Sequence, residues 1–231
     1  MRLNKYISQS GYCSRRKADE LIVQGKVLVN SRPVKVLGTK IDPEIDDVRV
    51  KNGPSLKPSK QKVLLMMYKP KGYVCTKSDQ HADRTVYDLL PEPYNRFISI
   101  GRLDKDSEGL LLFTNDGDLA NELAHPRHNK EKKYLVTVRG LLSDKELGRI
   151  EKGMKLYEYR TAPAKVKMLG YDQEKDRSQV EIILTEGKKR QIRNMFLALN
   201  HPVKALLRFE FGKYKLGGLN VGEWKLLAIR K

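Results

Sequence analysis

The feature that most limits how this chain can fold is the segment Asn52–Lys62, which reads NGPSLKPSKQK. Two prolines, one glycine, two serines and three lysines can neither pack a core nor continue a helix, so we predict a linker here. The chain has 231 residues, a length typical of one or two domains, and the linker favours two. We therefore expect a small domain over residues 1–51, a linker over 52–62 and a larger domain over 63–231.

Positive charge is concentrated before the end of this linker. The chain carries 46 Lys and Arg against 28 Asp and Glu, a formal net charge of +18, and residues 1–62 hold +8 of it. Per residue, the first quarter is thus about twice as basic as the rest. Such a balance is typical of a protein whose partner is a polyanion. Hydrophobic residues make up 39% of the chain, which excludes a wholly disordered protein.

Several function classes are disfavoured. The longest apolar run, Val63–Tyr68, is far shorter than the roughly 20 residues of a membrane span, and the first residues lack the apolar core of a secretory signal. Two cysteines are too few for a disulfide scaffold or a four-thiolate zinc site, and only His125 and His128 lie close together. Nucleotide phosphate loops are missing. We expect a cytoplasmic protein with no metal, cofactor or membrane partner, and nothing requires more than a monomer.

The small domain is predicted to be α+β. Apolar spacing predicts a helix over 2–10, and Ser14 is expected to cap a second helix that ends at Gly25. Alternating apolar residues predict short strands at 27–29, 33–36 and 48–50.

Three cations, Arg15, Arg16 and Lys17, open the second helix, where they oppose its dipole. They form either a solvated basic face or a set of phosphate contacts.

The large domain is predicted to be α+β with a largely antiparallel sheet, because strands outnumber helices and do not alternate strictly with them. The expected strands are 63–67, 73–76, 97–100, 110–114, 134–138, 164–168 and 180–185. The expected helices are 85–90, 118–124, 143–152 and 189–199. Ser143 and Glu146 form a capping box, and the spacing of Ile192, Met195, Phe196 and Leu199 assigns them to the core.

One acid stands out by its position. Asp104 lies in GRLD on the tight connection between the strands expected at 97–100 and 110–114, where an acid is well held and can face a cleft. Local chemistry alone favours an ordinary turn, where Asp and Gly are common. Basic segments occur elsewhere: Lys69–Tyr73 after the first strand, Lys132–Tyr134 at a strand start and Gly187–Arg193 at a helix start.

Two resemblances draw these segments together. RLNKYISQSGYCSRRKADELIVQGKVLVN resembles the alpha-L RNA-binding motif over residues 2–48, which implies a structured-RNA ligand. The segments around KPKGY, GRLDKDSEG, KKY and GKKRQIR, followed by HPVKALLRFEFGKYKLGGLNVGEW, resemble the RsuA/RluB/RluE/RluF family of ribosomal-RNA pseudouridine synthases. This second resemblance spans nearly the whole chain and implies a large mixed sheet with flanking helices and a central cleft.

The family resemblance implies roles for particular residues. Asp104 matches the catalytic aspartate, Tyr134 the tyrosine on which the base stacks, and Arg193 the basic residue that pairs with the aspartate. Arg102 would occupy the gap left by the flipped nucleotide or hold a phosphate, and Ile192 would support the ring from an apolar side. The RNA contacts further expected are Lys69, Lys133, Arg190, Arg15, Arg16 and Lys17. Structural roles are the alternatives for two of these residues. Arg193 would then be a solvated arginine on a helix, and Tyr134 a half-buried tyrosine on a strand.

The resulting hypothesis is an enzyme that isomerises uridine to pseudouridine in ribosomal RNA, with the large-subunit RNA slightly favoured. The reaction breaks one glycosidic bond and forms another, so a single carboxylate suffices, as a nucleophile toward sugar or base or as a base at the ribose. Taking a stacked base out of folded RNA costs a few kcal/mol, and stacking on Tyr134 would recover about 1–3 kcal/mol. The alternative is a ribosome-assembly protein or RNA chaperone for which binding is the main role.

Overall fold

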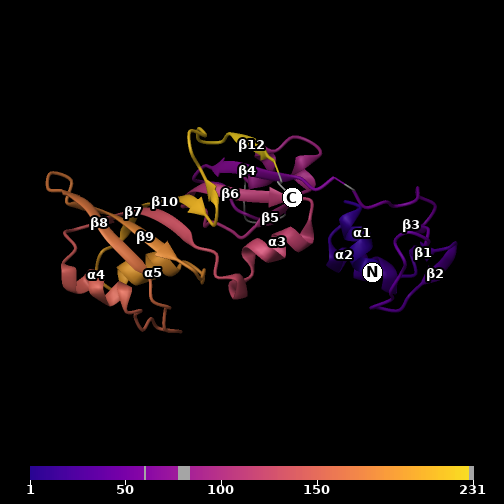
Figure 1. Cartoon of the computed structure of the whole chain (residues 1–231), viewed down its shortest axis with the longest axis horizontal. Helices are drawn as coiled ribbons and strands as arrows, with labels where there is room; N and C mark the ends of the chain where they lie inside the picture. Colours follow the sequence, from indigo (N-terminus) through magenta and orange to yellow (C-terminus); the bar gives the residue numbers. More distant parts are fainter. Residues whose placement is uncertain (60, 78–83, 229–231) are drawn as a thin grey trace.

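The structure is a computed structural model that describes residues 1–59, 61–77 and 84–228. Lys60 of the predicted linker lies outside the described residues. A small N-terminal module lies at one end of an elongated molecule, and a larger module with a long sheet makes up the rest (Figure 1). Within the described ranges no helix is long and apolar enough to cross a membrane.

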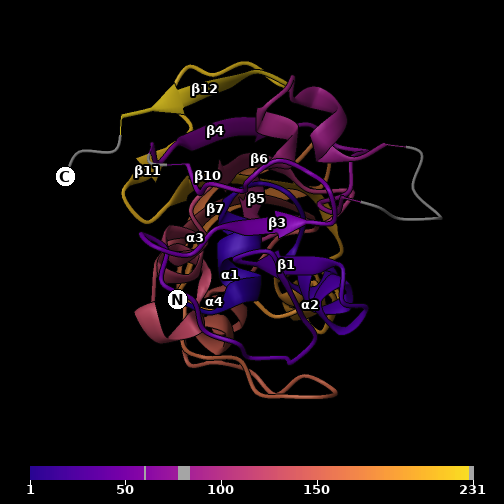
Figure 2. The same cartoon turned by 90° about the vertical axis from the view of Figure 1, so that its right-hand side faces the viewer.

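The small module has the predicted helices and strands. Helices α1 (Leu3–Gln9) and α2 (Arg15–Val23) pack on a three-stranded antiparallel sheet in the order β2-β1-β3 (Figure 2). The strands are β1 (Val27–Val29), β2 (Arg32–Val34) and β3 (Val48–Val50). Ser14 caps α2 as predicted, since its Oγ accepts a hydrogen bond from the backbone N–H of Lys17 at 3.2 Å. The module's core includes Leu3, Tyr6, Ile7, Ala18, Ile22, Val27 and Val48.

The segment predicted as a linker is partly packed. Leu56 is buried in the core of the small module, its N–H donates to Val48, and its carbonyl accepts from the hydroxyl of Tyr6. The prediction that residues 52–62 cannot pack a core is therefore wrong at Leu56. One leucine among polar residues is a weak pattern, and only the tertiary contact with Tyr6 reveals it.

In the described part of the large module, nine strands form one sheet, whose main order is β12-β4-β6-β10-β7-β9-β8. β5 pairs with β6, and β11 pairs with β10. The strands are β4 (Leu64–Lys69), β5 (Ile98–Ile100), β6 (Glu108–Thr114), β7 (Lys132–Arg139), β8 (Lys165–Asp172), β9 (Arg177–Leu184), β10 (Val203–Phe211), β11 (Tyr214–Lys215) and β12 (Trp224–Leu227). All named pairs are antiparallel except β6 with β10, so the predicted α+β class and largely antiparallel sheet are confirmed.

The parallel contact between β6 and β10 joins the two halves of the sheet over only two residue pairs, Leu207 with Glu108 and Arg208 with Gly109. Gly109 has a φ of +109°, and a Cβ there would lie 2.2 Å from the carbonyl oxygen of Arg208. Only glycine permits this close approach of two backbones. The glycine five residues after Asp104 is thus required by the junction at the middle of the sheet.

Three α-helices of the large module flank the sheet: α3 (Gly117–Ala124), α4 (Asp144–Glu151) and α5 (Gln191–Leu197). The Ser143–Glu146 capping box is present, and the predicted stripe from Ile192 to Leu199 is buried in the core beneath β7 and β9. Both α4 and α5 lie on the half of the sheet that contains β7, β8 and β9 (Figure 1).

Two expectations about local structure are wrong, and a long strand was not predicted. Residues 73–76 do not form a strand, since Val74 makes a single bridge to Thr85. The helix expected over 85–90 is the 3-10 helix η1 (Val86–Leu89); two further short 3-10 helices are η2 (Tyr94–Arg96) and η3 (Pro126–His128). Strand β10 was not predicted, because VKALLRFEF lacks clear alternation and contains mostly helix-favouring residues.

Candidate active site

Asp104 lies on the turn between β5 and β6. The turn begins at Gly101, whose φ of +72° is favourable only for glycine, and it closes where the N–H of Ser107 donates to the carbonyl of Asp104 at 3.0 Å. The Asp104 side chain is 33% exposed and lines a pocket of about 480 Å³. The turn therefore presents one carboxylate to a cavity at the centre of the sheet.

Lys69 holds this turn from inside the protein. Its side chain is fully buried. Its Nζ donates to the carbonyls of Ser107 at 2.7 Å, Pro70 at 2.9 Å and Asp104 at 3.2 Å. The carbonyl of Lys105 lies further away, at 3.5 Å. Burial lowers the pKa of this ammonium, although nearby Asp104 and Asp106 act in the opposite direction. The prediction that Lys69 contacts RNA phosphates does not fit this structure, because its side chain has no exposed surface.

Arg193 on α5 approaches the same turn from the opposite side. Its Nε lies 4.0 Å from Oδ2 of Asp104, while one terminal nitrogen donates to the carbonyl of Asp106 at 2.9 Å and to Oγ of Ser107 at 3.3 Å. Burial, together with the neighbouring charge of Arg190, lowers the pKa of the guanidinium. A guanidinium remains charged in proteins even so, and this one offers the carboxylate a fixed, partly desolvated counterion.

The apolar wall of the pocket is formed by Tyr134, Ile192, Leu103, Leu184 and Leu206. Tyr134, near the start of β7, is buried, and Ile192 is buried one residue before Arg193. The structure thus brings Asp104, Tyr134 and Ile192 onto one cavity, with Arg193 directly behind the carboxylate. A flat ring that entered this cavity would meet apolar side chains and an aromatic ring beside a carboxylate.

The rim of the pocket is basic. Arg102 and Arg190 are exposed and line it, together with Lys105, Lys188 and Lys189. Arg190 has a φ of +52° and directly precedes α5. Lys133 does not line the pocket, and its ammonium pairs with Glu210 on β10 at 2.9 Å. Arg15, Arg16 and Lys17 lie on the small module, away from this pocket.

Two further residues of the site were missed from the sequence. Cys75 lines the pocket, and its sulfur accepts a hydrogen bond from the N–H of Leu103 at 3.4 Å. Burial raises the pKa of this thiol. Ser107, which is also buried, is the residue that Arg193 contacts. The sequence around these two residues does not mark them as part of a site, because a lone cysteine and a serine in a turn are common. Only their contacts in the folded protein place them there.

No group of three His, Cys, Asp or Glu side chains within the described ranges is placed to hold a metal ion. The site as built offers a carboxylate with its counterion, an aromatic ring and a surrounding set of exposed cations. Carboxylates serve as nucleophiles or general bases, aromatic rings stack on nucleobases, and exposed cations bind phosphates. The fold and the site together define an enzyme that modifies a base in RNA.

Comparisons with known proteins give the particular class. Residues 63–198 match the RNA pseudouridylate synthase family, and residues 1–46 match the S4 domain. The chain is 40% identical over 227 residues to ribosomal large subunit pseudouridine synthase B of Bacillus subtilis, covering 98% of this chain and 92% of that protein. The chain belongs to the RNA pseudouridylate synthase family, and it is an isomerase that converts uridine to pseudouridine.

Other relatives agree. The protein called ribosomal large subunit pseudouridine synthase B in Yersinia pestis is 34% identical, covering 99% of this chain and 73% of that protein. A crystal structure of a pseudouridylate synthase superposes with a TM-score of 0.70 at 31% identity, covering 99% of this chain and 96% of that chain. Both modules are therefore shared with known members of the family.

Proposed function

We propose that this enzyme isomerises a uridine in the ribosomal RNA of the large subunit, with Asp104 as its essential carboxylate and the target base flipped into the central pocket. The observation that carries the proposal is that Asp104 and Tyr134 line one cavity while Nε of Arg193 lies 4.0 Å from the Asp104 carboxylate. The large-subunit target is supported by the names of the relatives in Bacillus subtilis and Yersinia pestis.

The proposed chemistry is an intramolecular transfer. The bond between N1 of uracil and C1′ of ribose breaks, the base turns, and a bond forms between C5 and C1′. C5 gives up its hydrogen and N1 gains one, so atoms balance without a co-reactant. Asp104 acts as a nucleophile toward the sugar or the base, or as a base at the ribose, and the geometry is compatible with each.

The other residues of the site bind and orient. Arg193 fixes the direction of the Asp104 carboxylate through its grip on Ser107 and the carbonyl of Asp106. Tyr134 and Ile192 hold the uracil ring within an apolar wall that limits access of water while the base is detached. Arg102 and Arg190 at the rim bind the flanking phosphates or, for Arg102, take the place of the flipped nucleotide.

The test is a map of pseudouridine in both large ribosomal RNAs from cells that lack the gene. We expect one or a few large-subunit positions to lose pseudouridine and to regain it with the wild-type gene but not with an Asp104→Asn gene. If every pseudouridine persists without the gene, the proposed activity is refuted. If the lost position lies in the small-subunit RNA, the proposed target is wrong while the reaction stands.

A further inference from the structure

A second cavity lies between the two modules. Its volume is about 1630 Å³, more than three times the 480 Å³ of the active-site pocket and beyond the 300–1,000 Å³ or so of a typical small-molecule site. One wall is the loop between α1 and α2, and the other is formed mainly by η2, the start of β5 and residues 75–77. We call this cavity the intermodule groove. Its size suits a segment of polymer better than a small ligand.

The intermodule groove adjoins the active site. Cys75 and Thr76 line both the groove and the pocket that contains Asp104. A strand with one nucleotide in the pocket would therefore have its neighbouring nucleotides close to the groove.

The charge of the groove suits a polyanion. Among the described residues, five cations and no Asp or Glu line it; the cations are Arg15, Lys17, Lys62, Lys77 and Arg96. Three of these cations pair with carboxylates outside the lining: Lys17 with Glu20, Lys62 with Asp116 and Arg96 with Glu92. Within the part of the chain that the structure describes, Arg15 makes a long contact to the amide oxygen of Asn4 at 3.4 Å and pairs with no carboxylate. Burial lowers the pKa of Lys77, whose Nζ donates to the carbonyl of Arg96 at 2.7 Å.

Aromatic rings stand on both walls. Tyr12, at the tip of the loop between α1 and α2, is 50% exposed. Across the groove, Tyr94 is held against Phe97 and Trp224 at ring-centroid distances of 5.4 and 5.2 Å. Tyr94 is half-buried, so Tyr12 is the exposed ring of the pair. An exposed ring among cations is typical of single-stranded nucleic-acid binding, because a base stacks on the ring and phosphates contact the cations.

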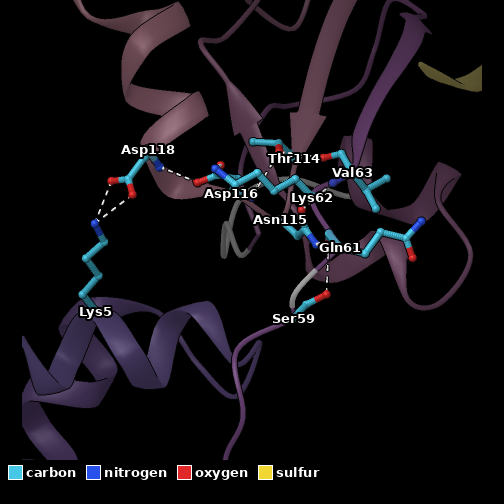
Figure 3. A network of polar contacts seen from close by, with 9 residues as sticks. All are labelled: Lys5, Ser59, Gln61, Lys62, Val63, Thr114, Asn115, Asp116 and Asp118. Carbon is cyan, nitrogen blue, oxygen red and sulfur yellow. Dashed lines mark hydrogen bonds and ion pairs between the residues drawn. The ribbon is translucent and has the colours of Figure 1, made fainter. Parts of the chain in front are cut away.

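An ion pair connects the two modules (Figure 3). Nζ of Lys5 on α1 lies 2.8 Å from both carboxylate oxygens of Asp118 on α3. The end of the linker is tied to the large module, because Lys62 pairs with Asp116 at 2.6 Å and the amide of Asn115 accepts from the N–H of Val63 and donates to the carbonyl of Gln61. The two walls of the groove are thus connected by this ion pair as well as by the linker.

We propose that the intermodule groove binds the single-stranded RNA that directly adjoins the target uridine, with Tyr12 stacking on a base and Arg15 and Arg96 binding phosphates. The inference rests on the proposed function for its substrate class, RNA, and adds the path that the substrate takes. Recognition would then include nucleotides next to the modified one, and both modules would hold the same strand.

Charge reversal tests the path. The double variant Arg15→Glu/Arg96→Glu is compared with Arg149→Glu, an exposed arginine on α4 far from the groove, and with wild type. Fluorescence anisotropy of a labelled twelve-residue oligouridine, titrated with the full-length proteins at several salt concentrations, measures the binding. We expect at least roughly tenfold weaker binding for the double variant and a salt slope smaller by about 1.4, at about 0.7 per lost phosphate contact on a single strand. Affinity and slope equal to those of Arg149→Glu would overturn the proposal.

Stacking by Tyr12 is tested separately. Tyr12→Ala should weaken oligouridine binding at least roughly fivefold, and Tyr12→Phe should restore wild-type binding. Photo-crosslinking with a 4-thiouridine oligonucleotide should attach RNA to the peptide that contains Tyr12 or to the one that contains residues 94–97. Crosslinks confined to the pocket and the outer surface would refute the path. These readouts need no turnover, so a failure of the groove and a failure of the proposed isomerase activity on ribosomal RNA are told apart.

Discussion

Nε of Arg193 lies 4.0 Å from Oδ2 of Asp104 and is a buried nitrogen without a hydrogen-bond partner among the described residues. One terminal nitrogen of the guanidinium donates to Oγ of Ser107 and to the carbonyl of Asp106. A small movement of the carboxylate would complete a charge-assisted hydrogen bond, and apo active sites commonly show such long contacts. The pair is therefore arranged for a contact that tightens when substrate enters.

Arg193→Lys should lower kcat about 100-fold, because lysine keeps the charge but cannot hold Ser107 and the Asp106 carbonyl while it faces Asp104. Tritium release from RNA labelled at C5 of uridine measures the reaction, since C5 loses its hydrogen. Arg149→Lys on α4 is the matched control and should keep wild-type activity. A kcat for Arg193→Lys within a factor of two of wild type would rule out the positioning role.

Asp104→Asn should form no pseudouridine and should bind RNA as well as wild type does. The amide has the shape of the carboxylate but is neither a nucleophile nor a base, and the backbone contacts of the turn to Lys69 are unaffected. Single-turnover tritium release and RNA-binding titrations measure the two properties. Turnover above one per cent or so of wild type would contradict the assignment of Asp104.

Tyr134→Leu should weaken catalysis by roughly 1–3 kcal/mol, the value of one stacked base, whereas Tyr134→Phe should retain the ring and the stacking. Because Tyr134 is buried in the core of the β7 half of the sheet, unfolding is followed for both variants. Equal losses of kcat/KM in the phenylalanine and leucine variants would show that the hydroxyl, and not the ring face, is what matters.

Lys69→Met should destabilise the protein by about 2–4 kcal/mol, because it leaves buried carbonyls of the Asp104 turn without a donor. Lys71→Met is the control: Lys71 is exposed and pairs with Glu108 at 3.2 Å, so its loss should cost under about 1 kcal/mol. Urea unfolding of both variants gives the difference. Similar stabilities would mean that the turn is held by other contacts.

Asp116→Asn should remove a pH-dependent part of the stability. Burial acts to raise the pKa of Asp116, but Lys62 and the N–H groups of Asp118 and Leu119 outweigh it and hold that pKa below the usual 3.8. A lowered folded-state pKa contributes stability above 3.8 that is lost as the pH falls through the folded value.

Asparagine caps α3 as well as aspartate does, so the variant isolates the charge. We expect wild type to be about 1 kcal/mol more stable at pH 6 and the difference to shrink as the pH falls below 3.8. Urea unfolding between pH 6 and pH 3 measures it, and a difference that stays constant down to pH 3 would assign the effect to the cap alone.

Much of the fold was predictable because its signals are local. The Ser14 cap, the Ser143–Glu146 capping box and the apolar stripe on α5 each lie within a single helix. β10 was missed for the opposite reason: it runs through the middle of the sheet, so neighbours on both sides decide its conformation against the propensities of its residues.

Some residues of the candidate site could likewise be predicted from the sequence, and others could not. The family resemblance indicated Asp104, Tyr134 and Arg193, and the structure brings them together although they come from a turn, a strand and a helix. Lys69 was assigned to the wrong role, since the sequence shows a basic turn but not that the ammonium is buried beneath it. Cys75 and Ser107 have meaning only through contacts made across the fold.

Because the ammonium of Lys69 is buried, salt should affect RNA binding and the chemical step differently. The cations at the rim and in the intermodule groove are exposed to ions in solution, so salt should weaken any contact that they make with RNA. The cation that holds the backbone of the Asp104 turn is enclosed by protein and is screened far less. Raising the ionic strength should therefore loosen the complex while the bond-making step, once substrate is bound, keeps its rate.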